Sequence, residues 1–180
     1  KVGVCLATSG PGATNLVTGL ATAYMDSIPV VAFTGQVETT MIGKDAFQEA
    51  DIRGITMPVT KHNYIVTDIK DLIRTVKEAF YIARTGRPGP VLIDLPSDVI
   101  NSSIEFDYPE EVNLPGYNPR YEPLEEELEE AAELISKAER PLVFAGGGIV
   151  LSGAADQLRD FVRSLRIPVT TSLMGLGSYP

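Results

Sequence analysis

The chain has 180 residues, enough for one domain of ordinary size or for one domain and part of another. Hydrophobic residues make up 44% of it and charged residues 22%, so the chain can bury a core and is not a disordered tail. Its formal net charge of -9 argues against a nucleic-acid partner, because a surface that binds a duplex needs an excess of cations.

The counts of cysteine and histidine exclude two further classes of protein. One cysteine, Cys5, cannot form a disulfide framework, and one histidine, His62, cannot complete a zinc site of Cys and His ligands by itself. No apolar run approaches the roughly 18 residues that a membrane-spanning helix requires. We therefore expect a soluble, cytoplasmic protein with no membrane partner.

Both ends of the chain suggest a piece of a longer protein. Residue 1 is Lys rather than Met and is followed at once by a strand-like run, and residues 173–180 form a loop that contains glycine. We expect part of the chemistry to lie on residues outside this sequence.

Charge divides the chain into two parts. Residues 1–104 have nine Lys and Arg against ten Asp and Glu, whereas residues 105–180 have six against fourteen. Three prolines and a glycine within residues 109–119 suit neither a helix nor a central strand. We predict one domain over residues 1–104, a linker lying on a surface over residues 105–121, and a second domain from residue 122 onward.

The first part alternates strand-like and helical patterns, as α/β folds with a parallel sheet do. Its strands are expected to be apolar throughout because both faces of such a sheet are covered. The predicted elements are strands at 2–7, 30–34 and 91–95 and helices at 13–25 and 69–85. For the second helix, Asp68 is the expected N-cap and Gly86 the expected left-handed residue beyond its end.

The second part shows the same alternation. The predicted elements are helices at 124–138 and 154–165, strands at 142–145 and 168–171, and a turn at residues 146–148. In the first of these helices we expect Leu128, Ala131, Leu134 and Ile135 to face the core and the glutamates to face water. Strand–helix–strand units of this spacing form right-handed parallel crossovers, so we predict doubly wound, three-layer α/β sandwiches.

Two glycine-rich stretches follow predicted strands, at the edge where parallel sheets bind ligands. Residues 8–15, TSGPGATN, are either a ligand-binding turn or a tight turn without a ligand, and the absence of Gly-Lys-Ser/Thr excludes a P-loop. Residues 146–148 are all glycine, but Leu151 replaces the third glycine of a dinucleotide fingerprint. A plain NAD site is therefore not expected, and a nucleotide in another pose stays open.

The remaining polar candidates each have a structural and a functional interpretation. Residues 43–49 form a surface loop or a site on a rigid scaffold. His62 is interpreted as a structural residue, and Cys5 as an inert strand residue. Arg87 is either a free surface cation or a fork that grips a phosphate or carboxylate. No Ser-His-Asp arrangement and no defensible pair of acid and base carboxylates is present.

Six blocks of sequence, taken in order, are more specific than any one of them. They are TSGPGATNL at 8–16, PVVAFTGQ at 29–36, IGKDAFQE at 42–49, TKHNY at 60–64, GRPGPVLIDLP at 86–96 and SLMGLG at 172–177. In this order they resemble the large subunit of acetolactate synthase (acetohydroxyacid synthase), a family of thiamine-diphosphate-dependent enzymes. The first, third and fifth blocks occur more widely among such enzymes, whereas AFQE followed by TKHN is particular to acetolactate synthases.

The resemblance implies an organisation and a reaction. Residues 1–104 would be the later part of a pyrimidine-binding domain, and residues 122–180 the start of a Rossmann-like middle domain that holds FAD. The full enzyme would condense two pyruvates, or pyruvate and 2-oxobutanoate, to 2-acetolactate or 2-aceto-2-hydroxybutanoate with loss of CO2, in the biosynthesis of valine, leucine and isoleucine. The Mg2+ ligands and the glutamate that activates thiamine would lie outside this chain, which alone would be inactive. The full chain would form a homodimer or homotetramer, and a regulatory small subunit is a further family expectation.

The resemblance also implies roles for individual residues. Gln48 would contact thiamine diphosphate and substrate, with Phe47 shaping the pocket beside it. The residues implied for FAD are Arg87, Gly146, Ser172, Leu173 and, more weakly, Ser27. Two positions depart from the family pattern: Glu38 stands where Pro is frequent, and Ser97 where Lys is usual. Both positions line the substrate channel in relatives. The two departures are therefore expected to affect inhibitor binding and the electrostatics of the channel more than the core chemistry.

Two other functions remain open from sequence alone. A related thiamine-diphosphate enzyme, such as a 2-oxo-acid decarboxylase or a pyruvate oxidase, would keep the fold and change the reaction. A non-catalytic, nucleotide-binding regulatory module would keep the glycine-rich turns and lack the reaction altogether.

Overall fold

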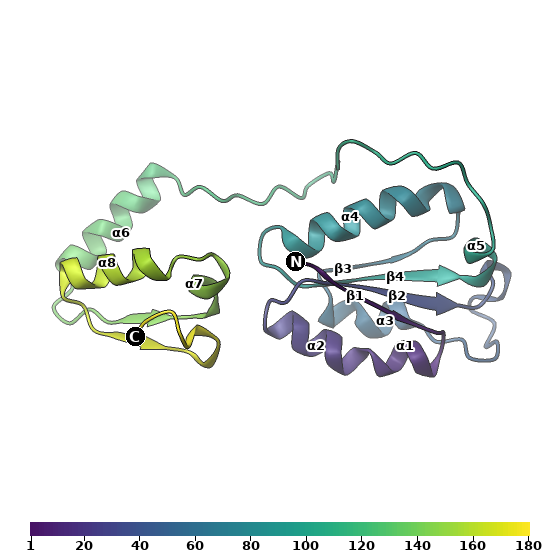
Figure 1. Cartoon of the computed structure of the whole chain (residues 1–180), viewed down its shortest axis with the longest axis horizontal. Coiled ribbons are helices and arrows are strands. Elements are labelled where there is room, and N and C mark those ends of the chain that lie inside the picture. The colour runs from purple at the N-terminus through teal and green to yellow at the C-terminus, as the bar shows by residue number, and fades with distance from the viewer. The chain divides into compact units, whose positions relative to one another are not determined.

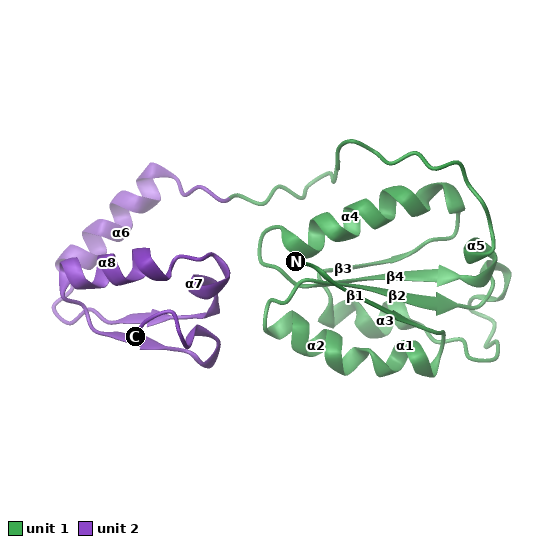
Figure 2. Ribbon diagram, in the orientation of Figure 1, with its two compact units in different colours: residues 1–120 green, residues 121–180 purple.

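A computed structural model describes all 180 residues of the chain. They divide into two compact units, residues 1–120 and residues 121–180 (Figure 2). No helix in either unit is both long enough and apolar enough to cross a membrane.

The first unit is built on a four-stranded sheet in which every neighbouring pair is parallel (Figure 1). The strand order is β1–β2–β4–β3, with β1 at Gly3–Ala7, β2 at Val30–Gln36, β4 at Pro90–Pro96 and β3 at His62–Ile65. The three strands predicted from continuous apolar runs are therefore confirmed. The edge strand β3 was missed because His62 and Asn63 interrupt any apolar run there.

Helices cover both faces of this sheet, which gives the predicted three layers (Figure 1). One face packs against α1 (Pro11–Asn15), α2 (Val17–Met25) and α3 (Ile52–Thr56), and the other against α4 (Leu72–Arg84). Successive strand residues point to opposite layers. Ala32 and Leu92 accordingly lie in the core with Leu20 of α2, whereas Val31 and Val91 lie in the core with Ala79 of α4.

The two predicted helices of this unit differ in detail from the expectation. The helix expected at 13–25 is divided at Leu16, whose N–H bonds to the carbonyl of Ala13 in an i to i+3 step typical of a tighter turn. The helix expected at 69–85 begins with a 3-10 turn at Ile69–Asp71. Asp68 caps that turn by accepting from Lys70 N–H at 2.9 Å, and Gly86 takes the expected left-handed conformation with φ 58°.

Residues 102–124 form no helix or strand, and much of this segment lies on the first unit. Leu114 and Tyr117 pack against the core beneath α4, and the Tyr117 hydroxyl donates to the carbonyl of Thr85 at 3.0 Å. Lys77 of α4 donates to the carbonyl of Glu110 at 2.6 Å. The segment is thus attached to α4 by apolar and polar contacts.

Three short helices complete the unit. They are the 3-10 helices η1 at Thr39–Met41 and η2 at Met57–Val59 and the α-helix α5 at Ser97–Ile100.

The second unit contains a parallel pair of strands, β5 (Val143–Ala145) and β6 (Val169–Thr171). Its helices are α6 (Glu125–Lys137), α7 (Gly147–Leu151) and α8 (Ala155–Leu165), followed by the turn η4 (Leu173–Gly175). Leu158 and Val162 of α8 form a small core with Ala145. The turn predicted at residues 146–148 is in fact the start of α7, because helical hydrogen bonding begins at once after β5.

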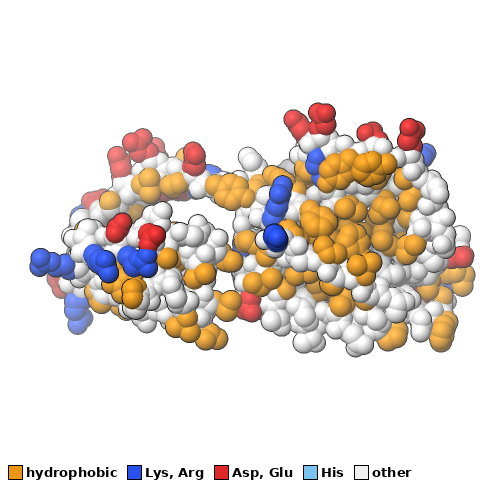
Figure 3. All heavy atoms as spheres, viewed as in Figure 1, with side chains coloured by type: hydrophobic (Ala, Val, Ile, Leu, Met, Phe, Trp, Pro, Cys, Tyr) orange, Lys and Arg blue, Asp and Glu red, His pale blue; other side chains and the backbone are white.

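The prediction that α6 buries an apolar stripe is wrong. Its predicted inward residues, Leu128, Ala131, Leu134 and Ile135, are all exposed, and no residue of α6 is buried. The physical reason is that the core of this unit lies between α8 and a sheet of only two strands, which offers α6 no apolar surface of its own. Figure 3 shows acidic and apolar side chains side by side along this helix.

Candidate functional site

The carboxyl ends of β1 and β2 bring together two of the sequence blocks. Residues 43–50, which we call the Gln48 loop, follow β2 and lead into α3. Gly10 follows β1 and has φ 56°, and a Cβ atom built there would lie 2.7 Å from the carbonyl oxygen of Gln48. Only glycine permits both this conformation and this approach. The glycine at position 10 of the TSGPGATN stretch is therefore required for the close packing of the Gln48 loop against it.

Within the Gln48 loop, the two predicted site residues point outward. Phe47 is 89% exposed, and Gln48 is exposed with φ 60°. Glu49, which the sequence analysis did not single out, closes the loop by accepting from Gly43 N–H and, at 3.0 Å, from Ala46 N–H. These backbone N–H groups lower the pKa of the Glu49 carboxyl, so the carboxylate is the form that holds the loop.

A buried carboxyl lies beside the same loop. Asp94 of β4 is 1% exposed and accepts from Thr34 Oγ1 at 2.7 Å and from Gln36 Nε2 at 3.0 Å. Burial raises the pKa of Asp94 to about 6, although both hydrogen bonds oppose the rise. Sequence analysis missed this group, yet its signal was present, because Asp94 is the one charged residue in the apolar run of β4.

The two positions that depart from the family pattern lie at this carboxyl edge too. Glu38 follows β2 by two residues and Ser97 follows β4 directly, and the ends of these strands are paired through Gln36 and Pro96. The residues next to them are bonded, since Thr39 Oγ1 donates to Asp98 at 2.5 Å. Both departures therefore border the edge on which the Gln48 loop lies.

Arg87 and Ser27 lie at the opposite edge of the sheet, where β2 and β4 begin. Arg87 Nε donates to Ser27 Oγ at 2.8 Å, and Arg87 Nη2 donates to the carbonyl of Met25 at 2.9 Å. A strand of seven residues spans roughly 20 Å. The structure thus brings Arg87 and Ser27 together but places them at the far end of the sheet from Gln48. One small ligand cannot contact both groups.

In the second unit, the three predicted residues lie together at the ends of β5 and β6. Ser172 N–H donates to the carbonyl of Ala145 at 3.0 Å, and a Cβ atom at Gly146 would lie 3.8 Å from Ser172 Oγ. Leu173 follows and is 81% exposed. Gly175 has a separate role, because a Cβ atom there would lie 2.3 Å from the carbonyl oxygen of Ala145. Gly146 has room for a ligand, whereas Gly175 is required by loop packing.

The other sequence candidates have structural roles. The ring of His62 packs edge-on against that of Tyr64, with 4.5 Å between the ring centroids. Partial burial lowers the pKa of its imidazole, so the neutral form is favoured. Burial raises the pKa of the Cys5 thiol, which disfavours a reactive thiolate. Lys61 donates to the carbonyl of Thr85 at 2.6 Å and so places its charge at the carboxyl end of α4, where the helix dipole favours a cation.

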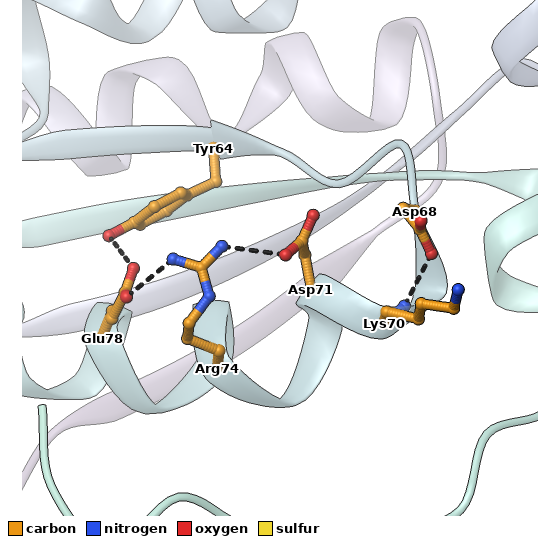
Figure 4. A network of polar contacts seen from close by, with 6 residues as sticks. All are labelled: Tyr64, Asp68, Lys70, Asp71, Arg74 and Glu78. Atoms are coloured by element: carbon orange, nitrogen blue, oxygen red, sulfur yellow. Dashed lines mark hydrogen bonds and ion pairs between the residues drawn. The ribbon is translucent and has the colours of Figure 1, made fainter.

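A second polar network ties β3 to α4 (Figure 4). Glu78 is buried and accepts from the Tyr64 hydroxyl and from Arg74 Nη1, each at 3.1 Å. Arg74 also pairs with Asp71 at 2.9 Å. Burial and the neighbouring Glu78 both raise the pKa of the Tyr64 hydroxyl. The bonds form a chain from Tyr64 through Glu78 and Arg74 to Asp71, so the network joins the edge strand to the helix.

Two hollows on the first unit are lined by none of the predicted site residues. One of about 410 Å³ is lined by Leu72, Leu95, Val99 and Ile104 together with neighbouring residues. Another of about 320 Å³ is lined by apolar and aromatic side chains that include Val76 and Phe106. No group of three or more His, Cys, Asp or Glu side chains is placed to hold a metal ion.

Two family models match the chain, one in each unit. Residues 1–55 match the N-terminal TPP binding domain of thiamine pyrophosphate enzymes, and residues 128–180 match the central domain of thiamine pyrophosphate enzymes. The chain belongs to the thiamine pyrophosphate enzyme family. The family resemblance found in the six blocks and the predicted α/β class with a parallel sheet are both confirmed.

Curated relatives align with the chain over its whole length. The acetolactate synthase large subunit of Corynebacterium glutamicum and the acetolactate synthase of Mycobacterium leprae are each 54% identical over 180 residues, covering 100% of this chain and 29% of each relative. A probable acetolactate synthase large subunit of Methanocaldococcus jannaschii is 51% identical over 183 residues, covering 100% of this chain and 31% of that protein. The chain therefore spans 29% to 31% of the length of these relatives.

The contact between Gly10 and the Gln48 loop predicts the effect of two matched substitutions. Gly10→Ala should lower the free energy of unfolding by about 1–3 kcal/mol, because it adds a clash with the Gln48 carbonyl to a left-handed backbone. Gly19→Ala in α2 should leave stability unchanged or raise it by up to about 1 kcal/mol, since nothing lies within 4 Å of the new Cβ atom. Urea unfolding measures both, and equal effects would contradict the packing role of Gly10.

The buried Asp94 predicts a pH dependence of stability. Its pKa is about 6 in the folded protein against an ordinary 3.8, so the folded state binds more protons than the unfolded state between these values. Asp94 should therefore lower the free energy of unfolding as the pH rises from about 4 to about 6, with little further change above. The difference in that energy between the wild type and Asp94→Asn should fall by up to about 3 kcal/mol over this range. A difference that stays constant or grows would refute the assignment.

Proposed function

We propose that this chain is part of an acetolactate synthase large subunit, which condenses two pyruvates, or pyruvate and 2-oxobutanoate, with loss of CO2. The observation that most supports the proposal is the identity of 54% to the Corynebacterium glutamicum large subunit across all 180 residues. The aligned region covers all 180 residues and therefore extends through both units. The pathway would be the biosynthesis of branched-chain amino acids, in the cytoplasm.

In this proposal the Gln48 loop faces thiamine diphosphate and substrate. The residue types suit this role, because the exposed amide of Gln48 and the exposed ring of Phe47 lie together at the carboxyl edge of a parallel sheet. Parallel sheets bind ligands at this edge. When bound, thiamine diphosphate supplies the electron sink for decarboxylation of a 2-oxo acid. Gln48 would bind and orient the substrate through its amide, and Phe47 would exclude water. The Mg2+ ligands and the activating glutamate would lie on residues outside this chain.

We further propose two groups of residues for FAD. Arg87 uses Nε and Nη2 within the protein and keeps the two N–H donors of Nη1, which suit an anionic ligand. Ser27 would hold the guanidinium in place rather than bind strongly itself. In the second unit, Gly146 would let the ligand approach the backbone, and Ser172 and Leu173 would contact it from the next loop.

A complete pocket requires a further surface over the Gln48 loop. Phe47 is 89% exposed, and a ring so exposed cannot exclude water on its own. We propose that the full protein supplies this surface by forming a homodimer or a homotetramer, and that a regulatory small subunit binds it elsewhere.

The reaction is tested on the protein expressed from its complete reading frame, supplied with pyruvate, thiamine diphosphate, Mg2+ and FAD. We expect 2-acetolactate, detected as acetoin after acidification. Gln48→Ala should lower kcat/KM at least about tenfold, the effect of losing one or two hydrogen bonds to substrate. Lys44→Ala, an exposed change in the same loop, should leave it unchanged. Acetaldehyde or peroxide as the main product would favour a decarboxylase or an oxidase instead, and no turnover would favour a non-catalytic module.

Flavin binding is tested on the same protein by its absorbance after gel filtration. Arg87→Ala should lower the fraction of protein that retains FAD at least about tenfold, because it removes the charged fork. Arg84→Ala, an exposed arginine at the end of α4, should retain FAD as the wild type does. Equal retention by both variants would remove Arg87 from the flavin site.

A further inference from the structure

The Gln48 loop has a conformation that needs support. Asp45 and Gln48 are non-glycine residues with φ of 55° and 60°, and such left-handed conformations cost of order 1 kcal/mol each unless neighbouring groups fix them. The loop is neither helix nor strand and most of it is exposed. Glu49 closes it internally, but those bonds do not connect it to the sheet.

Gln36, the last residue of β2, provides the connection. Its Nε2 donates to the carbonyl of Ala50 at 2.9 Å and to Asp94 Oδ2 at 3.0 Å, and its Oε1 accepts from Val37 N–H at 2.9 Å. Both hydrogens of Nε2 and the amide oxygen are thus used. Gln36 is only 7% exposed, so water cannot readily replace a lost partner.

Asp94 in turn fixes which way the Gln36 amide points. Its two oxygens accept from Thr34 and from Gln36, and no Lys or Arg bonds to it. A buried carboxyl without a cation costs stability that an apolar residue at this position of a central strand would not. The bonds therefore serve to orient Gln36 rather than to strengthen the sheet.

We propose that Gln36 and Asp94 are positioning residues that hold the Gln48 loop in the conformation required for binding of the cofactor and substrate. Hydrogen bonds run from the centre of β4, through the end of β2, to the carbonyl of Ala50, two residues beyond Gln48. Neither side chain contacts substrate. The inference rests on the proposed function only for its catalytic consequence, because the support of the loop can be measured separately.

The experiment compares Gln36→Met with Asn63→Leu in the protein from the complete reading frame. Asn63 is a matched control, since it is a buried amide whose Nδ2 donates to a backbone carbonyl, that of Arg53, at 2.7 Å, outside the Gln48 loop. Gln36→Met should accelerate hydrogen exchange of the loop amides of Ala46 and Glu49 at least about tenfold. It should also lower kcat/KM for pyruvate at least about tenfold. Asn63→Leu should do neither, although it too removes a buried hydrogen bond.

The two measurements separate failure of this inference from failure of the proposed function. If the wild type makes no acetolactate, the proposed function is lost, and the exchange comparison still decides whether Gln36 supports the loop. Equal exchange of the loop amides in the two variants would overturn the inference, as would accelerated exchange with unchanged kcat/KM. Should Gln36→Met fail to fold, Asp94→Asn preserves the side-chain volume and removes one of the two acceptors, and the same outcomes apply.

Discussion

The shared direction of the strands in the first unit determines where every candidate group lies. Because β1, β2 and β4 run parallel, the segments that follow them gather at one edge of the sheet and the segments that precede them gather at the other. The Gln48 loop and the turn at Gly10 therefore meet, while Arg87 and Ser27 meet about one strand length away. The thiamine and flavin contacts that we propose for this unit therefore divide between the two edges of one sheet.

Two buried carboxyl groups of the first unit, those of Glu78 and Asp94, each join separate elements of the fold. Asp94 and Glu78 are both nearly inaccessible to water, and each is fully bonded to neighbours, as buried polar groups must be. Glu78 binds Tyr64 and joins a helix to an edge strand. Asp94 binds Gln36, which joins the sheet to an exposed loop. The second arrangement lies at the edge that bears the candidate site, which is why we propose a consequence for function there and not at Glu78.

Two glycines that lie beyond strand ends, Gly10 and Gly175, serve close packing. Gly10 and Gly175 each approach a carbonyl so closely that a Cβ atom would overlap it. Gly146 differs, since only a serine oxygen lies near its open side. A glycine-rich stretch at the end of a strand is consequently an ambiguous signal, because the same residue type allows a neighbouring loop or a ligand to approach the backbone.

The sequence alone determined the elements whose pattern is local. Strands β1, β2 and β4 followed from continuous apolar runs, α4 from its period and its cap, and the family from six ordered blocks. Tertiary structure decided the rest: that β3 completes the sheet despite its polar residues, that α6 leaves its apolar stripe uncovered, and that Gln36 and Asp94 support a loop to which neither belongs. The reason is that Gln36 and Asp94 are 58 positions apart in the chain. Residues so distant meet only when strands pair, whereas periodicity and capping are set by neighbours along the chain.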